Sequence, residues 1–290
     1  MFSWGLLVNI GAVFLVSGQR RHAEVVFSEL RTLSERSKNV RNWLLSKGMD
    51  ADLAVMDGGL EKALELAGEI QARGAEVGVV GVAYIYASHP RVRSRIYLGA
   101  NLDAVERGIP RGVSLYLPEL CLVQAHLGMK KEVSEIIEKQ VVQRPNIGIT
   151  EDETRFWYDA LYLEAAVLAG HRQAAELLIE RLKGAGIYTT GDKFPTCVIR
   201  HLGGAVALLE RYDEARIYYR EAIRVCTEMP FRPELALSRL QLAELLLEHY
   251  PDEKKESLEH LDLAIKEFRE MKMQPSLERA LRHKEILKAR

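Results

Sequence analysis

The sequence has little of what marks several common protein classes. Only three cysteines occur in 290 residues, at Cys121, Cys197 and Cys226, and none belongs to a C-x-x-C pair. Neither a disulfide framework nor a zinc knuckle is therefore indicated, and a reducing, cytoplasmic compartment fits best. Forty basic residues against 41 acidic ones give a net charge of −1. A dedicated nucleic-acid binder usually carries a basic excess, so we expect no direct nucleic-acid binding.

Signatures of catalysis, metal binding and membrane insertion are also missing. The chain has no G-x-x-x-x-G-K-[ST], H-E-x-x-H or G-x-S-x-G sequence. Asp50 and Asp52 have the spacing of a calcium loop, but Ala54 stands where the next ligand belongs. The apolar stretch 4–16 has no positive charge before it and is too short to span a bilayer, so we interpret it as a buried helix. We expect no catalytic residue, no metal, no cofactor and no membrane association.

The sequence is instead rich in helical periodicity. Segments such as RQAAELLIERLKG and PELALSRLQLAELLLEH carry apolar residues at i, i+3, i+4 and i+7. They are rich in Leu, Ala, Glu, Lys and Arg, which lose little entropy in a helix. Alternating β patterns are nearly absent, and the one ambiguous run, VGVVGVAYIY at 77–86, has no turn signals at hairpin spacing. We therefore predict an all-α fold, with a helix at 77–86.

A repeat underlies these helices. A small residue recurs in a similar local pattern, and successive copies are 40, 41, 29, 42, 40 and 42 residues apart. These anchor positions are Ala23, Ala63, Ala104, Val133, Ala175, Ala215 and Ser257. Five residues before the first six anchors stand Gly18, Gly58, Gly99, Gly128, Gly170 and Glu210, where we expect helices to break. The 29-residue spacing must shorten a helix, so the third and fourth units should be the least regular.

Two copies of the repeat carry a specific resemblance. LGGAVALLERYDEARIYYREAI at 202–223 and IGAVFLVSGQRRHAEVVFSEL at 10–30 resemble the tetratricopeptide (TPR) family in their small, aromatic and alanine positions. The usual TPR unit has about 34 residues, whereas the period of this chain is close to 41. Longer units are similar to the C-terminal TPR-like arrays of bacterial MalT-type ATP-dependent transcription activators and of ATPase-linked adenylate/guanylate cyclases. The closing stretch 231–281 resembles the end of those arrays.

The resemblance implies a right-handed α-solenoid of about seven TPR-like helix pairs with a C-terminal capping helix. We expect a single domain over 1–290, with units at roughly 2–38, 40–75, 76–109, 111–144, 150–186, 193–229 and 231–272 and a cap at 275–289. A helix of the next unit should pack into the notch of each pair. Small residues such as Ala215 and Ala222 would let the backbones approach there, while Tyr212 and Tyr219 fill the gaps beside them.

By the same resemblance, the expected function is binding. The chain would be a non-catalytic scaffold, or a sensor and coupling module, of a bacterial signalling or transcription-regulatory protein. Its concave face would bind a protein, a peptide or a small effector; its oligomeric state stays open. It would be either the tail of a longer protein or a stand-alone adaptor. Two alternatives remain: an enzyme built on an α-solenoid, which needs three or more buried titratable residues meeting in a cleft, and a nucleic-acid-binding helical repeat, which needs a continuous basic stripe.

The concave face can be placed on the sequence. The inward row of each first helix should lie 18, 15 and 11 residues before the anchor. This row supplies the candidate groove residues Tyr86, His89, Arg93, Trp157, Glu164 and Arg200. Tyr, Trp and Arg dominate binding hot spots, and the two arginines suit a ligand that carries a carboxylate. The plainer alternative is that these side chains only coat an exposed face.

Overall fold

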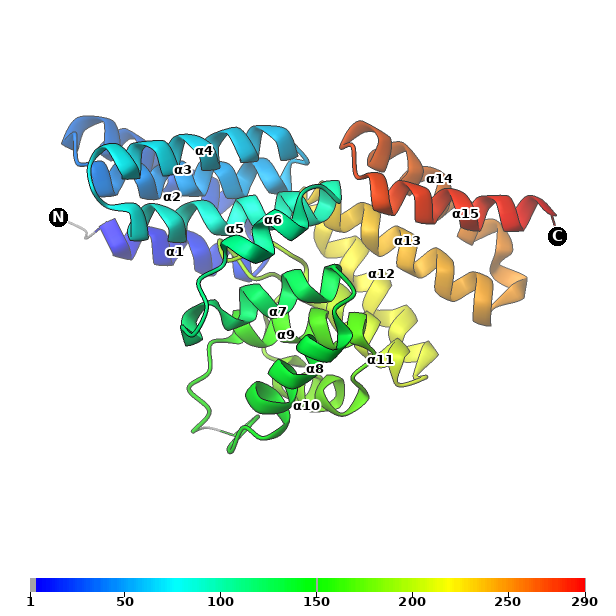
Figure 1. The fold of residues 1–290 in the computed structure, drawn as a ribbon. Coiled ribbons are helices and arrows are strands. Elements are labelled where there is room, and N and C mark those ends of the chain that lie inside the picture. Colours follow the sequence, from blue (N-terminus) through cyan, green and yellow to red (C-terminus); the bar gives the residue numbers. More distant parts are fainter. Residues whose placement is uncertain (1–3, 150, 290) are drawn as a thin grey trace.

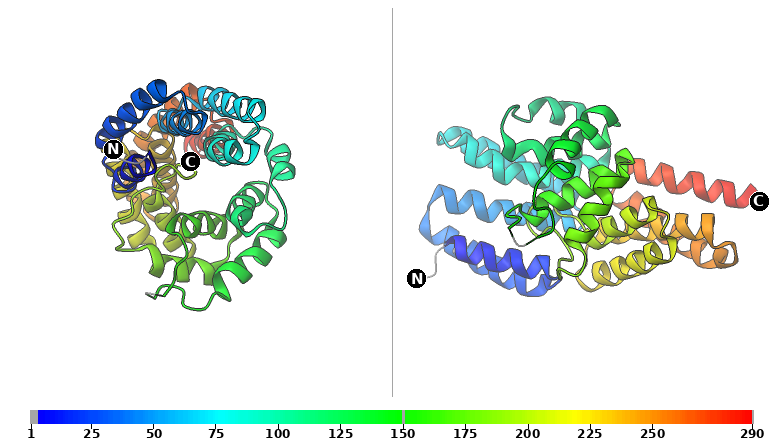
Figure 2. Two further views of the ribbon diagram at one scale, coloured as in Figure 1. Left: turned by 90° about the vertical axis from the view of Figure 1, so that its left-hand side faces the viewer. Right: turned by 90° about the horizontal axis from the view of Figure 1, so that it is seen from below.

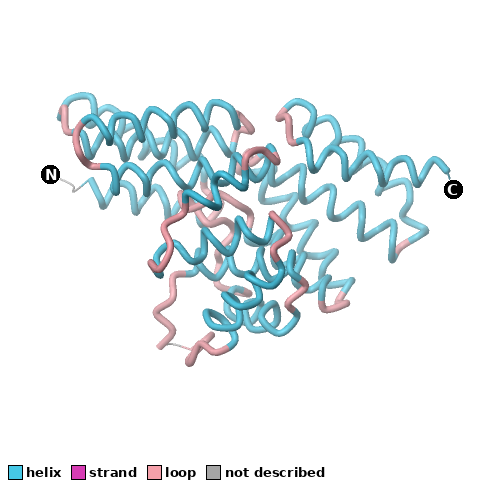
Figure 3. Tube along the Cα trace, viewed as in Figure 1, coloured by secondary structure: helices cyan, strands magenta, loops and turns pink. Residues whose placement is uncertain are grey.

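The computed structural model describes residues 4–149 and 151–289. Helices make up almost all of the regular structure in these residues (Figure 3). The one strand-like pairing among them is an isolated bridge between Thr189 and Cys197. The all-α prediction is therefore confirmed. Within the same two ranges, no helix is both long enough and apolar enough to cross a membrane.

Most of the helices are joined by short connections, and the two longest connections lie before α9 and before α11 (Figure 1). Their bounds are α1 Trp4–Val16, α2 Arg20–Ser37, α3 Val40–Met56, α4 Leu60–Glu76, α5 Val80–Leu98, α6 Leu102–Gly108, α7 Leu117–His126, α8 Lys130–Ile137, α9 Phe156–Ala169, α10 Arg172–Leu182, α11 Val198–Leu208, α12 Tyr212–Glu228, α13 Arg232–His249, α14 Lys254–Glu270 and α15 Gln274–Ala289. Three short turns of helix accompany them: η1 Ser114–Tyr116, η2 Glu138–Val142 and η3 Pro251–Glu253.

Helices end where the repeat predicts. The five glycines that precede an anchor have φ between 67° and 78°: Gly18, Gly58, Gly99, Gly128 and Gly170. Glycine adopts this left-handed conformation without the steric cost of a Cβ, which is why it often terminates a helix. Glu210, which follows α11, takes the same conformation with φ 66° although it is not a glycine. The predicted helix breaks are confirmed at all six positions.

The third and fourth units are the irregular ones. The ambiguous run at 77–86 leads into α5, which is helical from Val80 onward. The next helix, α6, has only seven residues, and α8 has only eight before it continues into the π-helical turn η2. The interval between Ala104 and Val133 holds most of α6 and the ten-residue α7, and these short helices take up the shortened spacing, as predicted.

Helices that follow one another in sequence pack together, from α1 on α2 to α14 on α15. Small residues are buried in this packing. Ala215 and Ala222 on α12 are fully buried. A Cβ added at Gly203 on α11 would lie 2.7 Å from the ring of Tyr219, so the glycine leaves the space that the tyrosine fills. Larger side chains at these positions would push α11 and α12 apart.

The first helices also contact the last ones. α3 touches α13 and α5 touches α15, and the helices are arranged around a ring in the left view of Figure 2. Arg20 on α2 donates a hydrogen bond to Asp57 at 2.5 Å and another to the carbonyl oxygen of Pro230. A Cβ at Gly58 would lie 2.4 Å from the sulfur of Met271. The beginning and the end of the described chain are therefore packed directly against each other.

The connection between α10 and α11, residues 183–197, begins exposed and is mostly buried from residue 189 onward, where it contacts α5 and α13; we call it the inner segment. It lies against α1, where Thr189 Oγ1 donates to the carbonyl oxygen of Leu15 at 2.9 Å. The opposite side of α1 faces solvent, since Leu6 and Val13 are 42% and 64% exposed. The prediction of a buried helix at 4–16 is therefore correct for one face only.

Candidate functional site

The inward face of α5 carries the first buried ion pair. Arg93 is fully buried, and its NH1 group donates to both carboxylate oxygens of Glu164 on α9, at 3.0 and 2.9 Å. Its NH2 group donates to the carbonyl oxygen of Phe194 in the inner segment at 3.3 Å. Tyr97 faces the same way as Arg93, because residues four apart share one side of a helix. α5 is thereby joined to α9 and to the inner segment.

Glu234, near the start of α13, is the second buried carboxylate. It accepts hydrogen bonds from the Tyr97 hydroxyl at 2.5 Å, and from the Thr196 hydroxyl and the Cys197 amide at 3.0 Å each. Arg200 on α11 adds two more, from Nε at 2.6 Å and from NH2 at 3.0 Å. This two-pronged contact is the geometry in which a guanidinium binds a carboxylate most strongly. The pair therefore fixes α13 against α11.

Two histidines complete the arrangement. His126 Nε2 lies 3.0 Å from Glu164 Oε1. His201 Nε2 lies 3.4 Å from Glu164 Oε2 and 2.7 Å from Thr196 Oγ1. Six of the buried side chains define what we call the central ion cluster: Arg93, Tyr97, Glu164, Arg200, His201 and Glu234. The cluster holds α5, α9, α11 and α13 around the inner segment.

Burial and pairing together set the protonation of the central ion cluster. Burial raises the pKa of Glu234, but Arg200 outweighs it and the pKa lies at about 2. Burial also raises the pKa of Glu164, and Arg93 and His201 outweigh it, so that this pKa lies well below its ordinary value. Burial and the neighbouring Arg200 lower the pKa of His201 to about 3. At neutral pH the cluster therefore balances two guanidinium charges against two carboxylate charges, beside a neutral histidine.

A cavity of about 200 Å³, which we call the central cavity, opens beside the cluster. Side chains from α5, α7, α9, α11, α13 and α15 line it. Its polar wall includes Glu164, Arg200, His201, His126, Gln241 and Ser276. Its apolar wall includes Ile96, Val167, Leu168, Leu237, Leu240 and Pro275. Six helices that are distant in sequence thus contribute to one site.

The structure brings most of the predicted groove residues together. Three of the six belong to the central ion cluster: Arg93, Glu164 and Arg200. His89 and Trp157 meet at the ring of Phe194, with centroid separations of 4.5 and 6.1 Å. Tyr86 lies apart from these, half-buried, next to Gly48 of α3. Five of the six predicted groove residues therefore gather at the central ion cluster or at the ring of Phe194, and Tyr86 is the exception.

These side chains are not a coat on an open face. Five of them are between 0% and 9% exposed: His89, Arg93, Trp157, Glu164 and Arg200. The alternative of a solvated surface row is therefore wrong for these five. The inner segment and α13 cover them, and neither covering element could be deduced from the repeat.

Sequence reasoning missed several residues of the site. Tyr97, His126 and Leu168 each stand seven residues before their anchors, one helical step beyond the predicted row. Extending that row by four residues would have found all three. Glu234 and Gln241 on α13 stand at no position that the row picks out, and no signal in the sequence marks them as partners of Arg200.

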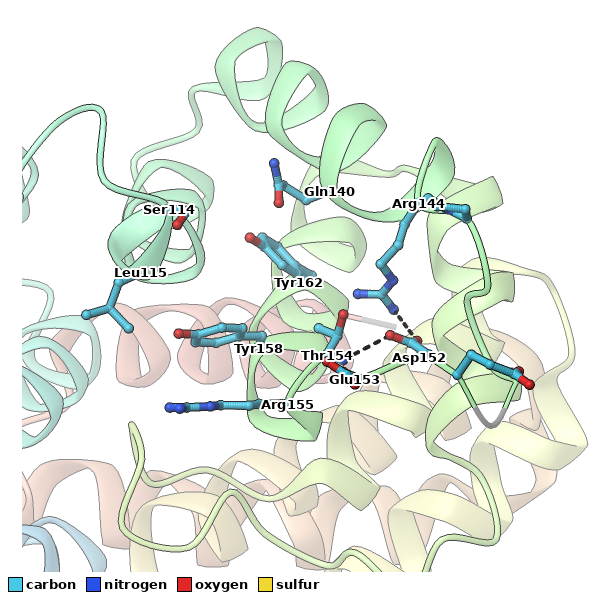
Figure 4. Close-up of a pocket in the computed structure, with 12 residues that line it drawn as sticks. Ser114, Leu115, Gln140, Arg144, Asp152, Glu153, Thr154, Arg155, Tyr158 and Tyr162 are labelled. Carbon is cyan, nitrogen blue, oxygen red and sulfur yellow. Dashed lines mark hydrogen bonds and ion pairs between the residues drawn. The ribbon is translucent and has the colours of Figure 1, made fainter.

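A second hollow, of about 540 Å³, lies between η1, η2 and the start of α9 (Figure 4). Arg155 and Tyr158 point side by side into its open space in Figure 4. Arg144 forms ion pairs with Asp152 at 3.2 Å and with Asp159 at 2.8 Å.

The central ion cluster has some of the residue types of a catalytic triad but not its geometry. A Ser-His-Asp triad places the hydroxyl and the carboxylate on opposite ring nitrogens. Thr196 Oγ1 and Glu164 Oε2 instead approach the same nitrogen, Nε2 of His201. Thr196 is also fully buried, and its hydroxyl donates to Glu234. Over residues 4–149 and 151–289, no group of three or more His, Cys, Asp and Glu side chains could hold a metal ion.

No protein-family model matches this chain, and a search of curated proteins finds no match. The likeness to TPR-like arrays thus rests on the repeat in the sequence. Any function must be argued from the central ion cluster and the cavity beside it.

Proposed function

We propose that this protein is a non-catalytic binding scaffold that holds a small effector in the central cavity. In this proposal the helix pairs form a right-handed TPR-like solenoid. The chain serves as the sensor or coupling module of a bacterial signalling or transcription-regulatory protein in the cytoplasm. The free, buried thiols of Cys121, Cys197 and Cys226 fit such a reducing compartment. A protein or peptide on the concave face is less favoured, because the inner segment already occupies that face.

One observation carries the proposal: buried charged side chains from distant helices line a cavity that is large enough for a ligand. Burying an ion pair costs desolvation that apolar packing would avoid, so such pairs contribute little to stability by themselves. Ligand sites typically combine apolar walls with a few fixed polar groups and with residues of perturbed pKa. The central cavity has all three features. Leu168 and Leu240 belong to its apolar wall, Gln241 is a fixed polar group, and His201 and Glu164 have shifted pKa values.

Catalysis is the second candidate, and one observation favours it. Glu164, Arg200 and His201 are buried titratable residues that meet in one cavity. An enzyme built on an α-solenoid would need such a group of three. Each of the three is already engaged with another charged or polar group of the cluster. A group held in this way orients a bound molecule more readily than it attacks one. Binding is therefore the stronger proposal.

A panel of small metabolites, screened by thermal shift, tests the scaffold proposal. Leu168 lines the central cavity and is 42% exposed, so Leu168→Trp should obstruct the cavity without disturbing the core. Leu263 on α14 is 45% exposed and lies outside the cavity, so Leu263→Trp is the matched control. A ligand should stabilise the wild type and the control but not Leu168→Trp. Equal stabilisation of all three proteins would reject the cavity as the site, and conversion of the ligand, followed by mass spectrometry, would favour the enzyme.

A further inference from the structure

We infer that the central cavity binds a small carboxylate with a branched aliphatic body. This inference rests on the proposed function and specifies the chemical class of its effector. It follows from three properties of the cavity wall: which hydrogen-bonding groups are unused, how large and apolar the space is, and how its charges balance.

The unused nitrogen groups of the wall are hydrogen-bond donors. A guanidinium has five N–H groups, and Arg200 directs four of them at Glu234, Thr196 and the amide oxygen of Gln241. One N–H on its NH1 group has no acceptor among the described residues. The amide nitrogen of Gln241 likewise has no acceptor there, although its oxygen is bonded to Arg200 at 3.2 Å. Two neighbouring donors are therefore available to one acceptor group.

The first turn of α15 adds to this donor surface. Ser276 lies in that turn and lines the cavity, and its hydroxyl has no partner among the described residues. In this turn Pro275 has no N–H, and the amides of Gln274 and Leu277 donate to the carbonyl oxygens of Lys272 and Met273. The amide of Ser276 is therefore the one N–H of the turn without an acceptor among the described residues, and it lies at the positive end of the helix dipole. A negatively charged oxygen group fits this surface better than a neutral or cationic group does.

Glu164 is the acidic member of the wall, and its capacity is already used. Arg93 donates to both of its oxygens, while His126 and His201 approach one oxygen each. Its charge is thereby balanced by Arg93 inside the cluster, and three hydrogen bonds occupy most of its acceptor sites. The cavity wall therefore does not select a cation.

The size and the apolar wall of the central cavity determine what the rest of the ligand, beyond its carboxylate, should be. Sites for drug-sized ligands hold about 300–1,000 Å³, whereas this cavity holds about 200 Å³. The apolar part of the lining is mainly aliphatic: Leu168, Leu237, Leu240, Ile96 and Pro275. Tyr97 adds one phenol ring, whose hydroxyl is already bound to Glu234. A compact branched chain of roughly amino-acid size fills such a space. The carboxylate would lie at Arg200 and Gln241, and the hydrocarbon would lie against the leucines.

Isothermal titration with 4-methylpentanoate tests the inference, and 4-methylpentanamide and isoamylamine are the matched neutral and cationic probes. The acid should bind saturably with one site, and the amide at least about tenfold more weakly, since a hydrogen bond to a charged group is worth more than one to a neutral group. N-acetyl-leucine presents the same carboxylate as the last residue of a peptide. Weaker binding of this longer molecule would identify a free acid as the source.

Gln241→Leu removes one of the two donors at a half-buried position outside the central ion cluster. The loss of this donor should weaken the binding of 4-methylpentanoate roughly tenfold or more. Gln173 is exposed on α10 and far from the cavity lining, so Gln173→Leu is the matched control and should bind like the wild type. Circular dichroism should show both variants folded.

The outcomes separate this inference from the function on which it rests. No saturable binding of the acid, equal binding of acid and amide, or unchanged affinity in Gln241→Leu would overturn the carboxylate assignment. If a neutral or cationic ligand is then found that Leu168→Trp excludes, the scaffold proposal stands without it. If no panel member depends on Leu168, both proposals fail.

Discussion

Glu234 offers the sharpest test of the central ion cluster. It is fully buried and accepts five hydrogen bonds, two of them from Arg200. Glu234→Gln keeps the shape of the side chain but removes its charge, so that Arg200 stays buried without a counter-ion. Removing one partner of a buried ion pair costs about 3–5 kcal/mol. Because the carboxylate pKa falls from 4.5 to about 2, linkage gives a similar figure of roughly 3 kcal/mol.

Urea denaturation followed by circular dichroism measures this loss. Glu65→Gln is the control, because Glu65 forms an exposed pair with Lys62 and its loss should cause no measurable change. The lowered pKa of Glu234 stabilises the wild type fully above about pH 4.5, and this contribution disappears as the pH falls toward 2. The gap between wild type and Glu234→Gln should therefore be constant from pH 7 to pH 5 and narrow below that. A loss under about 1 kcal/mol at pH 7 would refute the role we give to the pair.

Three further predictions concern packing, backbone and pH. Ala215→Leu should overpack the fully buried position of Ala215 on α12 and lower the free energy of unfolding, measured by urea denaturation, by about 1–3 kcal/mol. The same substitution at exposed Ala72 should leave the free energy of unfolding unchanged. Gly191→Ala should lower the melting temperature more than Gly184→Ala: both glycines have positive φ, but only the first would place a Cβ against α1. Burial lowers the pKa of His201 to about 3. Between about pH 6.5 and pH 3 the histidine is therefore protonated in the unfolded chain but neutral in the folded chain. His201→Gln should remove a slope of about 1.4 kcal/mol per pH unit between those values, and an unchanged slope would contradict the burial of a neutral histidine.

Much of the backbone could be predicted because its signals are local. Glycine readily adopts the left-handed conformation that often ends a helix, and at Gly18, Gly99 and Gly170 it follows an apolar helical pattern, so that the local sequence marks the helix ends. The buried alanines of α12 follow from the same local spacing. The inner segment has no comparable signal, because its course depends on contacts with α1 and α5 that are far away in sequence.

The candidate site shows where that local reasoning ends. Helical spacing predicts that Arg93 and Glu164 face inward, since each lies the same distance before its anchor. It does not predict that they bind each other, because 71 residues separate them and the pairing depends on how α5 and α9 approach. Glu234 lies outside the predicted row altogether, although it is the partner of Arg200.

Closure of the ring explains why the predicted surface row became a buried cluster. In an open row of helix pairs, Arg93 and Arg200 would face water and need no partner. Contacts of α3 with α13 and of α5 with α15 close the ring; α13 then covers Arg200, while the inner segment covers Arg93. Once covered, each guanidinium requires a carboxylate, because an unpaired buried charge costs several kcal/mol. The same closing helices, α13 and α15, supply Gln241 and Ser276 to the central cavity. A ligand that bridges these residues and Arg200 would therefore bind the closed ring in preference to an open one, and so stabilise the contacts between the first and last helices.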